Sequence, residues 1–373
     1  MAKAILLAAT LLASVGAQEP IVQEFTVQST DGTSIHGQAD LPSGGKPRVA
    51  VVMSAGTGLF DRDVRFGASG TERDRLFKDL AMRFTARGLA AVRYDRRGVN
   101  FGKSGAELLD KPVSGSSTTQ SQRDDLNAVY RWALAKQGLG ARCVILLGHS
   151  EGTLHIARLA ESGAPAPLAV IGLGAVGISP LETVRWQISG RDAYSLEQMD
   201  ADGDGRVTKS EVEARWKQTP SSFAGTITPL LPPDGQAWTP EQIAAVRGAQ
   251  ATAYGLHKTA ALNLADDAPY PNADTPMAKA SWWKSWFTDA ASPATMLARW
   301  KVPVFLHWGT VDSQTAPHLQ EPPLRAALGN NARITIHPDK GHGLGDGALL
   351  GPIDVAIADR IADEAAQAAR SCR

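Results

Sequence analysis

An alternation of short apolar runs with amphipathic segments constrains the fold of this 373-residue chain more than any other feature. Continuous apolar runs are typical of strands that are buried on both faces of a sheet, and they occur at 48–56, 89–95, 143–150, 167–177, 302–309 and 333–339. Segments with helical spacing separate them, among them 71–88, 120–138 and 151–163. This order predicts an α/β fold whose mostly parallel, doubly wound central sheet carries helices on both faces.

The alternation stops between residues 178 and 300, where helical pieces and prolines replace the buried strands, and it resumes at 302–309. A long interruption between two strands of one sheet indicates an insertion, which we interpret as a helical cap. The predicted organisation is a first part of the core at 18–177, the cap at 178–300 and a second part of the core at 301–373.

The first seventeen residues have the pattern of a secretory signal peptide. Lys3 supplies a positive charge, residues 4–13 are almost wholly apolar, and small residues precede a cleavage site after Ala17. The alternative is a buried N-terminal helix. With cleavage, we expect a secreted or periplasmic protein, and no later stretch is long and apolar enough to span a membrane. The 38 basic residues equal the 38 acidic ones and form no basic stripe, which argues against nucleic acid as a partner.

The chain has two cysteines, Cys143 at the start of an apolar run and Cys372 next to the C-terminal residue. In an oxidising compartment they can form a disulfide, and otherwise they remain free thiols. The sequence contains no distance between them, so both alternatives stay open.

The pentapeptide at 148–152, Gly-His-Ser-Glu-Gly, matches the pattern G-x-S-x-G. It directly follows an apolar strand and directly opens a helix, which is the setting of a nucleophile elbow. The alternative is an ordinary strand-to-helix turn that matches by chance. The context favours the elbow, and we therefore predict Ser150 as a nucleophile.

A serine hydroxyl needs a base to become nucleophilic, and in this kind of fold the acid and then the histidine follow the serine along the chain. Asp312 and His342 each follow an apolar strand, so both fall where ligands bind in open α/β sheets. We predict His342 as general base and acid and Asp312 as the carboxylate that orients it. Asp339 and Asp289 are the alternative acids.

Acyl transfer also needs N–H donors for the charge that develops on the substrate oxygen. The backbone N–H of Glu151, directly after the nucleophile, is one candidate. The glycine-rich loop at 55–58 supplies the other, for which we choose Thr57, with Gly58 as the alternative.

Three tryptophans at helical spacing, Trp282, Trp283 and Trp286, lie in the predicted cap. Such a stripe is most often part of a hydrophobic core. The second interpretation is that these side chains form a wall of the substrate pocket, since ligand pockets are commonly lined with aromatic residues.

Residues 200–211 match the ligand pattern of an EF-hand calcium loop. The predicted ligands are three aspartates, one backbone carbonyl, a threonine and a glutamate that can bind through both oxygens: Asp200, Asp202, Asp204, Arg206, Thr208 and Glu211. The alternative is a solvated acidic turn. EF-hands usually occur in pairs, and the sequence contains no second loop of this pattern. We therefore expect one Ca²⁺ ion that holds the cap in place, rather than a sensor pair, and the alternative is a regulatory ion that controls the opening of the cap.

Several motifs together resemble a group of bacterial serine carboxylesterases within the α/β-hydrolase fold. They are A-G-T-G-L-F-D-R-D at 55–63, V-R-Y-D-R-R-G-V at 92–99, G-H-S-E-G at 148–152, W-W-K-S-W-F at 282–287 and V-D-S-Q at 311–314. The resemblance implies an esterase with a Ser150-His342-Asp312 triad, a helical cap and a small acyl ester as substrate. Thioesterase, lipase or peptidase chemistry with the same triad remains open, as does a non-catalytic calcium-binding protein on this scaffold.

Overall fold

The computed structural model describes residues 21–43, 47–66, 71–216, 228–272, 279–346 and 351–373. The signal peptide predicted at 1–17 lies outside these residues. Among the helices described, none combines the length and apolar character needed to cross a membrane.

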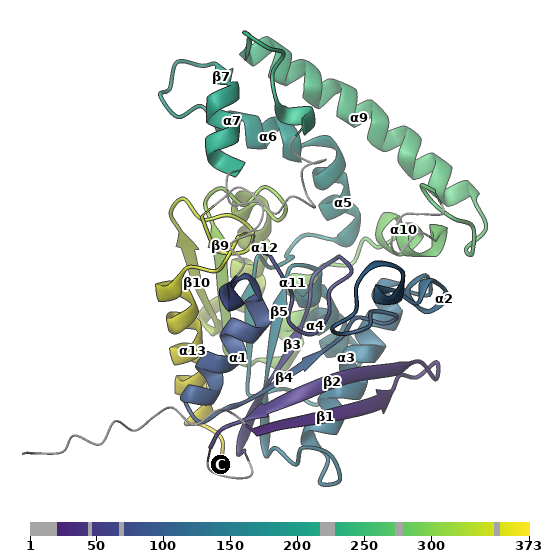
Figure 1. Ribbon diagram of the computed structural model, residues 1–373, viewed down its shortest axis with the longest axis vertical. Coiled ribbons are helices and arrows are strands. Elements are labelled where there is room, and N and C mark those ends of the chain that lie inside the picture. Colours follow the sequence, from purple (N-terminus) through teal and green to yellow (C-terminus); the bar gives the residue numbers. More distant parts are fainter. Residues whose placement is uncertain (1–20, 44–46, 67–70, 217–227, 273–278, 347–350) are drawn as a thin grey trace, which may run out of the picture.

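One large sheet forms the centre of the molecule, and its strands lie in the order β1-β2-β4-β3-β5-β6-β9-β10 (Figure 1). The antiparallel hairpin of β1 and β2 is followed by parallel strands. The bounds are β1 Ile21–Gln28, β2 Ser34–Leu41, β3 Val49–Ser54, β4 Ala90–Tyr94, β5 Cys143–His149, β6 Ala169–Leu173, β9 Val304–Gly309 and β10 Ala332–His337.

Helices cover both faces of this sheet. Alternate residues of β3 show the division: Val51 and Met53 pack in one core cluster with α1 and α13, whereas Ala50 and Val52 pack in the other with α3, α4, α11 and α12. The bounds are α1 Leu76–Ala86, α2 Lys111–Ser114, α3 Thr119–Leu134, α4 Glu151–Glu161, α11 Pro293–Leu297, α12 Pro317–Leu328 and α13 Val355–Ala369. Burial on both faces explains the continuous apolar runs, and the predicted α/β architecture is confirmed.

The segment between β6 and α11 forms the part of the molecule drawn above the sheet in Figure 1. Its elements are α5 Pro180–Ser189, α6 Arg191–Glu197, β7 Val207–Thr208, α7 Lys209–Trp216, β8 Ala237–Trp238, α9 Pro240–Asn263 and α10 Ala280–Phe287. The indole N–H of Trp186 on α5 donates to the carbonyl oxygen of Ser313 at 2.8 Å, so α5 rests on the loop that follows β9.

The two cysteines form a disulfide in this structure, with a Cα–Cα distance of 6.0 Å across 229 residues of sequence. Cys143 begins β5 and Cys372 follows α13. The bridge therefore joins the C-terminal helix to the amino-terminal end of β5, while Ser150 directly follows the other end of that strand.

Candidate active site

Ser150 occupies the turn between β5 and α4 with φ +53° and ψ −124°. A non-glycine residue in this region of backbone space carries about 1–3 kcal/mol of strain, which persists only where the surroundings enforce it. The flanking glycines are part of that enforcement. A Cβ atom on Gly148 would lie 2.7 Å from the backbone of Gly152, and one on Gly152 would collide with the carbonyl oxygen of Ser54. The turn therefore presents the Ser150 side chain beyond the end of the strand.

The loops after β9 and β10 bring Asp312 and His342 together, with 2.9 Å between Asp312 Oδ2 and His342 Nδ1. Asp312 is completely buried, and its carboxylate also accepts hydrogen bonds from the Gln314 N–H, the Thr315 N–H and the Thr315 hydroxyl. Burial alone would raise the pKa of Asp312, but His342 and the two hydrogen bonds from Thr315 outweigh it and lower the pKa below its ordinary value. The carboxylate is thus ionised and held in one orientation, and the sequence contained no sign of the part that Thr315 plays.

Ser150 and His342 both lie against the turn that follows β6. The Ser150 N–H donates to the Leu173 carbonyl at 2.9 Å, and the His342 ring lies against Gly174, where an added Cβ would be 2.9 Å from ring atoms Cε1 and Nδ1. The rings of His149 and His342 are 4.7 Å apart between centroids. The ends of β5, β6, β9 and β10 therefore gather the serine, the imidazole and the carboxylate at one edge of the sheet.

Neither of the alternative acids occupies this place. Asp289 forms an ion pair with Arg158 of α4. Asp339 is exposed, and its backbone N–H donates to the Thr310 hydroxyl at 2.9 Å. Of the three aspartates considered from the sequence, the structure places Asp312 against His342.

The loop at 55–58 packs directly on the elbow, because a Cβ added to Gly56 would lie 2.9 Å from Ser150 Cβ. Across the residues that the structure describes, we find no hydrogen bond from the backbone N–H of Thr57 or of Glu151 to another residue. Two amides beside the serine are thus available to a ligand oxygen, as an oxyanion site requires.

A buried ion pair that the sequence analysis did not identify lies beneath this loop. Glu151 Oε2 is 3.0 Å from Arg96 Nη1 and accepts a hydrogen bond from the Thr57 hydroxyl at 2.8 Å. Arg96 Nη1 also donates to the Gly56 carbonyl oxygen. Burial would raise the pKa of Glu151, but Arg96, His155 and Thr57 lower it to about 2.

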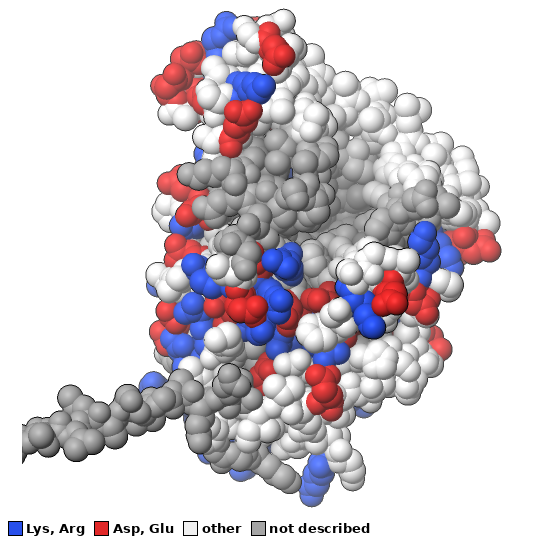
Figure 2. All heavy atoms as spheres, viewed as in Figure 1, with Lys and Arg blue, Asp and Glu red and all other residues white. Residues whose placement is uncertain are grey.

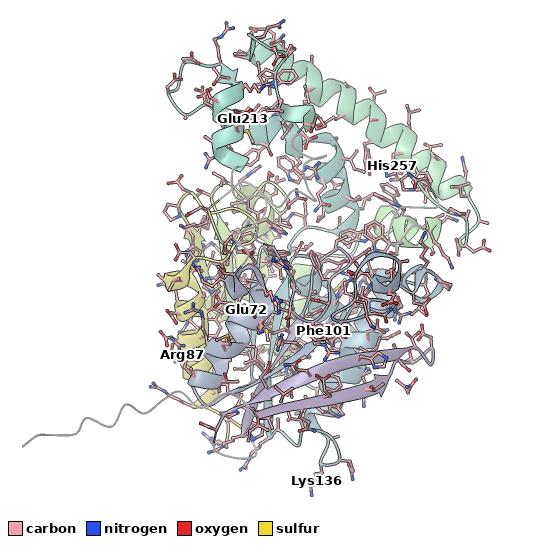
Figure 3. All side chains as sticks on the ribbon, in the orientation of Figure 1. Glu72, Arg87, Phe101, Lys136, Glu213 and His257 are labelled. Carbon is pink, nitrogen blue, oxygen red and sulfur yellow. A yellow bond between two sulfur atoms is a disulfide. The ribbon has the colours of Figure 1, made fainter. Side chains whose placement is uncertain are left out.

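The three tryptophans lie on α10 in a small core of the inserted segment. Trp282 and Trp286 are buried beside Leu154 of α4 and Val184 of α5, and Trp283 packs against this cluster. The ring of Trp283 is 4.4 Å from that of His257, which is labelled on α9 in Figure 3. These contacts describe the packing of α10 against its neighbours, and pocket lining by the same side chains stays a prediction.

Residues 201–206 of the 200–211 loop are exposed, and the loop is closed by its own hydrogen bonds. Single carboxylate oxygens of Asp200, Asp202 and Asp204 lie within 4.8 Å of one another. The Gly203 and Gly205 N–H groups donate to Asp200, while Glu211 accepts from the Ala201 and Thr208 N–H groups. Each carboxylate retains further lone pairs, so this donor set fits a hard cation such as Ca²⁺.

The structure pairs this loop with a segment that sequence reasoning missed. Val207 and Thr208 of β7 pair in antiparallel fashion with Trp238 and Ala237 of β8. The helices that follow begin alike: Thr208 and Glu211 exchange hydrogen bonds at the start of α7, and the corresponding pair at the start of α9 is Thr239 and Gln242. Two similar strand–helix units are therefore joined side by side, and the second has a neutral amide where the first has Glu211.

No protein-family model matches the chain. Over 139 residues it is 27% identical to Esterase EstD of Thermotoga maritima, a match that covers 37% of this chain and only 30% of the relative. Its fold resembles that of Est1E from Butyrivibrio proteoclasticus, with a TM-score of 0.51, 12% identity and coverage of 93% of this chain and 99% of that one. It also resembles a structure entitled Lipase (Open form), with a TM-score of 0.50, 12% identity and coverage of 94% and 99%.

The strand order, the helices on both faces and these structural likenesses define an α/β-hydrolase fold. Identities this low establish the fold and leave the reaction to be argued from the site.

Proposed function

We propose that the protein is a serine hydrolase that cleaves carboxylic esters through an acyl-enzyme. The observation that carries this proposal is the combination of a strained Ser150 with the buried His342–Asp312 pair at the same edge of the sheet. The similarity to a protein named an esterase agrees with it.

In the first half of the reaction, His342 Nε2 takes the proton of the Ser150 hydroxyl while Oγ attacks the ester carbonyl carbon. Asp312 accepts a hydrogen bond from the Nδ1–H group of His342 and stabilises the imidazolium that forms. The Thr57 and Glu151 N–H groups stabilise the negative charge on the former carbonyl oxygen. The bond to the alcohol then breaks, and His342 gives its proton to the leaving alcohol.

In the second half, water attacks the acyl-Ser150 carbonyl and gives its proton to His342. The tetrahedral intermediate breaks its bond to Ser150 Oγ, which recovers that proton, and the carboxylic acid leaves. A small-molecule acyl ester is consumed, and its alcohol and acid are released.

The inserted segment would act as a cap that one Ca²⁺ ion holds in place through the side chains of Asp200, Asp202, Asp204, Thr208 and Glu211 and the carbonyl of Arg206. The closeness of the three aspartates supports this proposal, as does the join between β7 and β8, through which the loop contacts the segment that begins α9. The ion would supply positive charge to an exposed acidic loop and takes no part in the reaction. Calorimetric titration with CaCl₂ tests the site, and a protein that binds no Ca²⁺ at millimolar concentrations contradicts it.

The disulfide supports export of the protein to an oxidising compartment, as the N-terminal sequence predicts. Mass spectrometry of the protein from culture medium or periplasm tests this proposal. A chain that still begins at Met1 and remains in the cytoplasm contradicts it.

The hydrolysis of p-nitrophenyl acetate, butyrate and octanoate by wild type and Ser150→Ala tests the reaction. We expect wild type to turn over and the variant to lose at least about 10⁴-fold in kcat, because the nucleophile is absent. A fluorophosphonate probe should label wild type at Ser150 and leave the variant unlabelled. A protein that is neither active on esters, thioesters and amides nor labelled contradicts the proposal and favours a binding function.

A further inference from the structure

Three polar contacts join Arg96 and the 55–58 loop to the first residue of α4. Arg96 follows β4, and its side chain is buried. Its Nη1 donates to the Gly56 carbonyl in the loop after β3 and pairs with Glu151, the first residue of α4. The Thr57 hydroxyl donates to the same Glu151 oxygen. Hydrogen bonds therefore hold the peptide between Gly56 and Thr57 on both sides.

Because the peptide bond is planar, these contacts fix the direction of the Thr57 N–H. In a trans peptide the C=O and the N–H point in opposite directions within one plane. When Arg96 holds the Gly56 carbonyl, the Thr57 N–H is turned away from Arg96. A Cβ added to Gly56 would lie 2.9 Å from Ser150 Cβ, so the Gly56–Thr57 peptide packs close to the nucleophile, and the direction of its N–H is fixed before any substrate binds.

The ion pair also decides the charge next to the nucleophile. Glu151 directly follows Ser150 in the chain, and it is only 1% exposed. An unpaired buried carboxylate there would oppose the negative charge that develops on the substrate oxygen. Arg96, which is 4% exposed, balances that charge, and its hydrogen bond polarises the peptide that carries the Thr57 N–H.

We propose that Arg96 is a positioning residue of the site: with Glu151 it orients the Gly56–Thr57 peptide so that the Thr57 N–H stabilises the tetrahedral intermediate. This inference rests on the ester hydrolysis proposed above. It assigns a role to a side chain that touches the loop and no part of the substrate.

Arg97 provides a matched control for Arg96. It is the next residue, it is also buried, and it forms a comparable ion pair, with 2.5 Å between Nη2 and Asp125 Oδ1. In the described part of the chain, its other hydrogen-bond partners are Asp31, Ser116 and Ser121, none of which lies in the 55–58 loop. Arg96→Lys and Arg97→Lys therefore share the loss of a buried guanidinium and differ in their contact with that loop.

The experiment measures kcat and KM on p-nitrophenyl butyrate, the inhibition constant of a boronic acid that mimics the tetrahedral intermediate, and the melting temperature. For Arg96→Lys we expect kcat to fall by about 10- to 100-fold with KM changed less than about threefold, because a donor that acts in the transition state is misplaced. Boronate inhibition should weaken by the same factor as kcat/KM. Arg97→Lys should lower the melting temperature similarly and retain kcat within about threefold of wild type.

A second pair of variants tests the other contact of the same peptide. Thr57→Val keeps the shape of the side chain and removes the hydroxyl that donates to Glu151, so kcat should fall, while Thr57→Ser should restore most of it. A Thr57→Val variant with the kcat of wild type contradicts the proposal.

The outcomes separate this inference from the proposed reaction. A folded Arg96→Lys protein with the kcat and boronate affinity of wild type overturns the inference alone, and so do equal losses in the Arg96 and Arg97 variants. A wild-type protein that neither hydrolyses esters nor reacts with the fluorophosphonate probe overturns the proposed function, and this inference with it.

Discussion

The core and the cap of this molecule hold their charged groups in opposite ways. In the core, Asp312 and Glu151 are buried and paired with His342 and Arg96. In the cap, the aspartates of the 200–211 loop are exposed for the most part and accept hydrogen bonds from the loop's own backbone. On the surface, Figure 2 shows charged side chains on the visible face of the core and at the tip near this loop, while the flank that α9 forms carries few.

The difference indicates what each region depends on. A buried charge without a partner destabilises a protein strongly, so the core keeps each group in one position relative to its partner. Exposed carboxylates that crowd together repel one another, and a counterion relieves that repulsion. We therefore expect the core to be sensitive to the loss of a buried partner such as Asp312, and the cap to be sensitive to the removal of Ca²⁺.

The largest effect is expected from Asp312→Asn. The amide cannot hold and stabilise the imidazolium of His342 as the carboxylate does, so kcat should fall by about 10⁴-fold with little change in the circular dichroism spectrum. Asp339→Asn is the control, because this aspartate is exposed and its backbone N–H donates to Thr310, and it should keep kcat within about twofold. Equal losses in the two variants would show that Asp312 is not the orienting acid.

Removal of the disulfide should have the next largest effect, which is a loss of stability of the core. The bridge closes a loop of 229 residues, and the loss of such a constraint from the unfolded state lowers the free energy of unfolding by about 3–5 kcal/mol. Urea titration of Cys372→Ala measures this loss. The kcat at 25 °C should stay within about twofold, because the bridge lies at the opposite end of β5 from Ser150. Unchanged urea stability would contradict the prediction.

Calcium removal should affect the cap and leave the core folded. A ligand at 100 times its dissociation constant stabilises the folded state that binds it by about 2.7 kcal/mol, so a chelator should lower the first melting transition and expose 178–300 to trypsin. Asp200→Asn should abolish the response to Ca²⁺. Asp266→Asn changes another exposed cap aspartate, which pairs with Lys284 of α10 and not with the loop, and should retain the response. The absence of any chelator effect on melting or proteolysis would contradict the proposed role of the ion.

The smallest expected effect is a loss of core stability in mild acid. Burial, with help from His307 and Arg360, lowers the pKa of His337 from 6.5 to about 4. As the pH falls from 6.5 toward 4, the unfolded chain binds a proton that native His337 does not, so this residue progressively lowers the free energy of unfolding over that range. Above pH 6.5 the effect is absent.

Urea midpoints at pH 7.5 and 4.5 for wild type and His337→Gln measure this contribution, and the variant should lose less stability between the two values. His257→Gln is the counterpart in the cap, where the half-buried ring also has a lowered pKa. Its effect should be smaller because water screens it more. A His337 variant with the same pH dependence as wild type would contradict the prediction.

Much of the fold followed from the sequence because the sheet is buried on both faces. Such strands must be apolar throughout, and the apolar runs at 143–150 and 302–309 therefore predict two of them from the sequence alone. Parallel strands end at a common edge, which is why Asp312 and His342, chosen as residues that follow strands, lie beside each other.

Other features could not be predicted, since they depend on contacts between distant segments. Arg96 and Arg97 are neighbours of the same type, yet one holds the 55–58 loop and the other pairs with Asp125 on α3. The pairing of β7 with β8 joins two-residue strands that are too short to leave a pattern.

The sequence by itself determined the succession of strands and helices along the chain, the glycine-flanked turn at Ser150 and the acidic spacing of the 200–211 loop, because these depend on local backbone preference and periodic burial. Only the tertiary structure decided that Cys143 and Cys372 are joined, that Asp312 rather than Asp289 faces His342, and that Arg96 lies under the Gly56–Thr57 peptide. These outcomes depend on distances across the folded chain, which residue spacing does not contain.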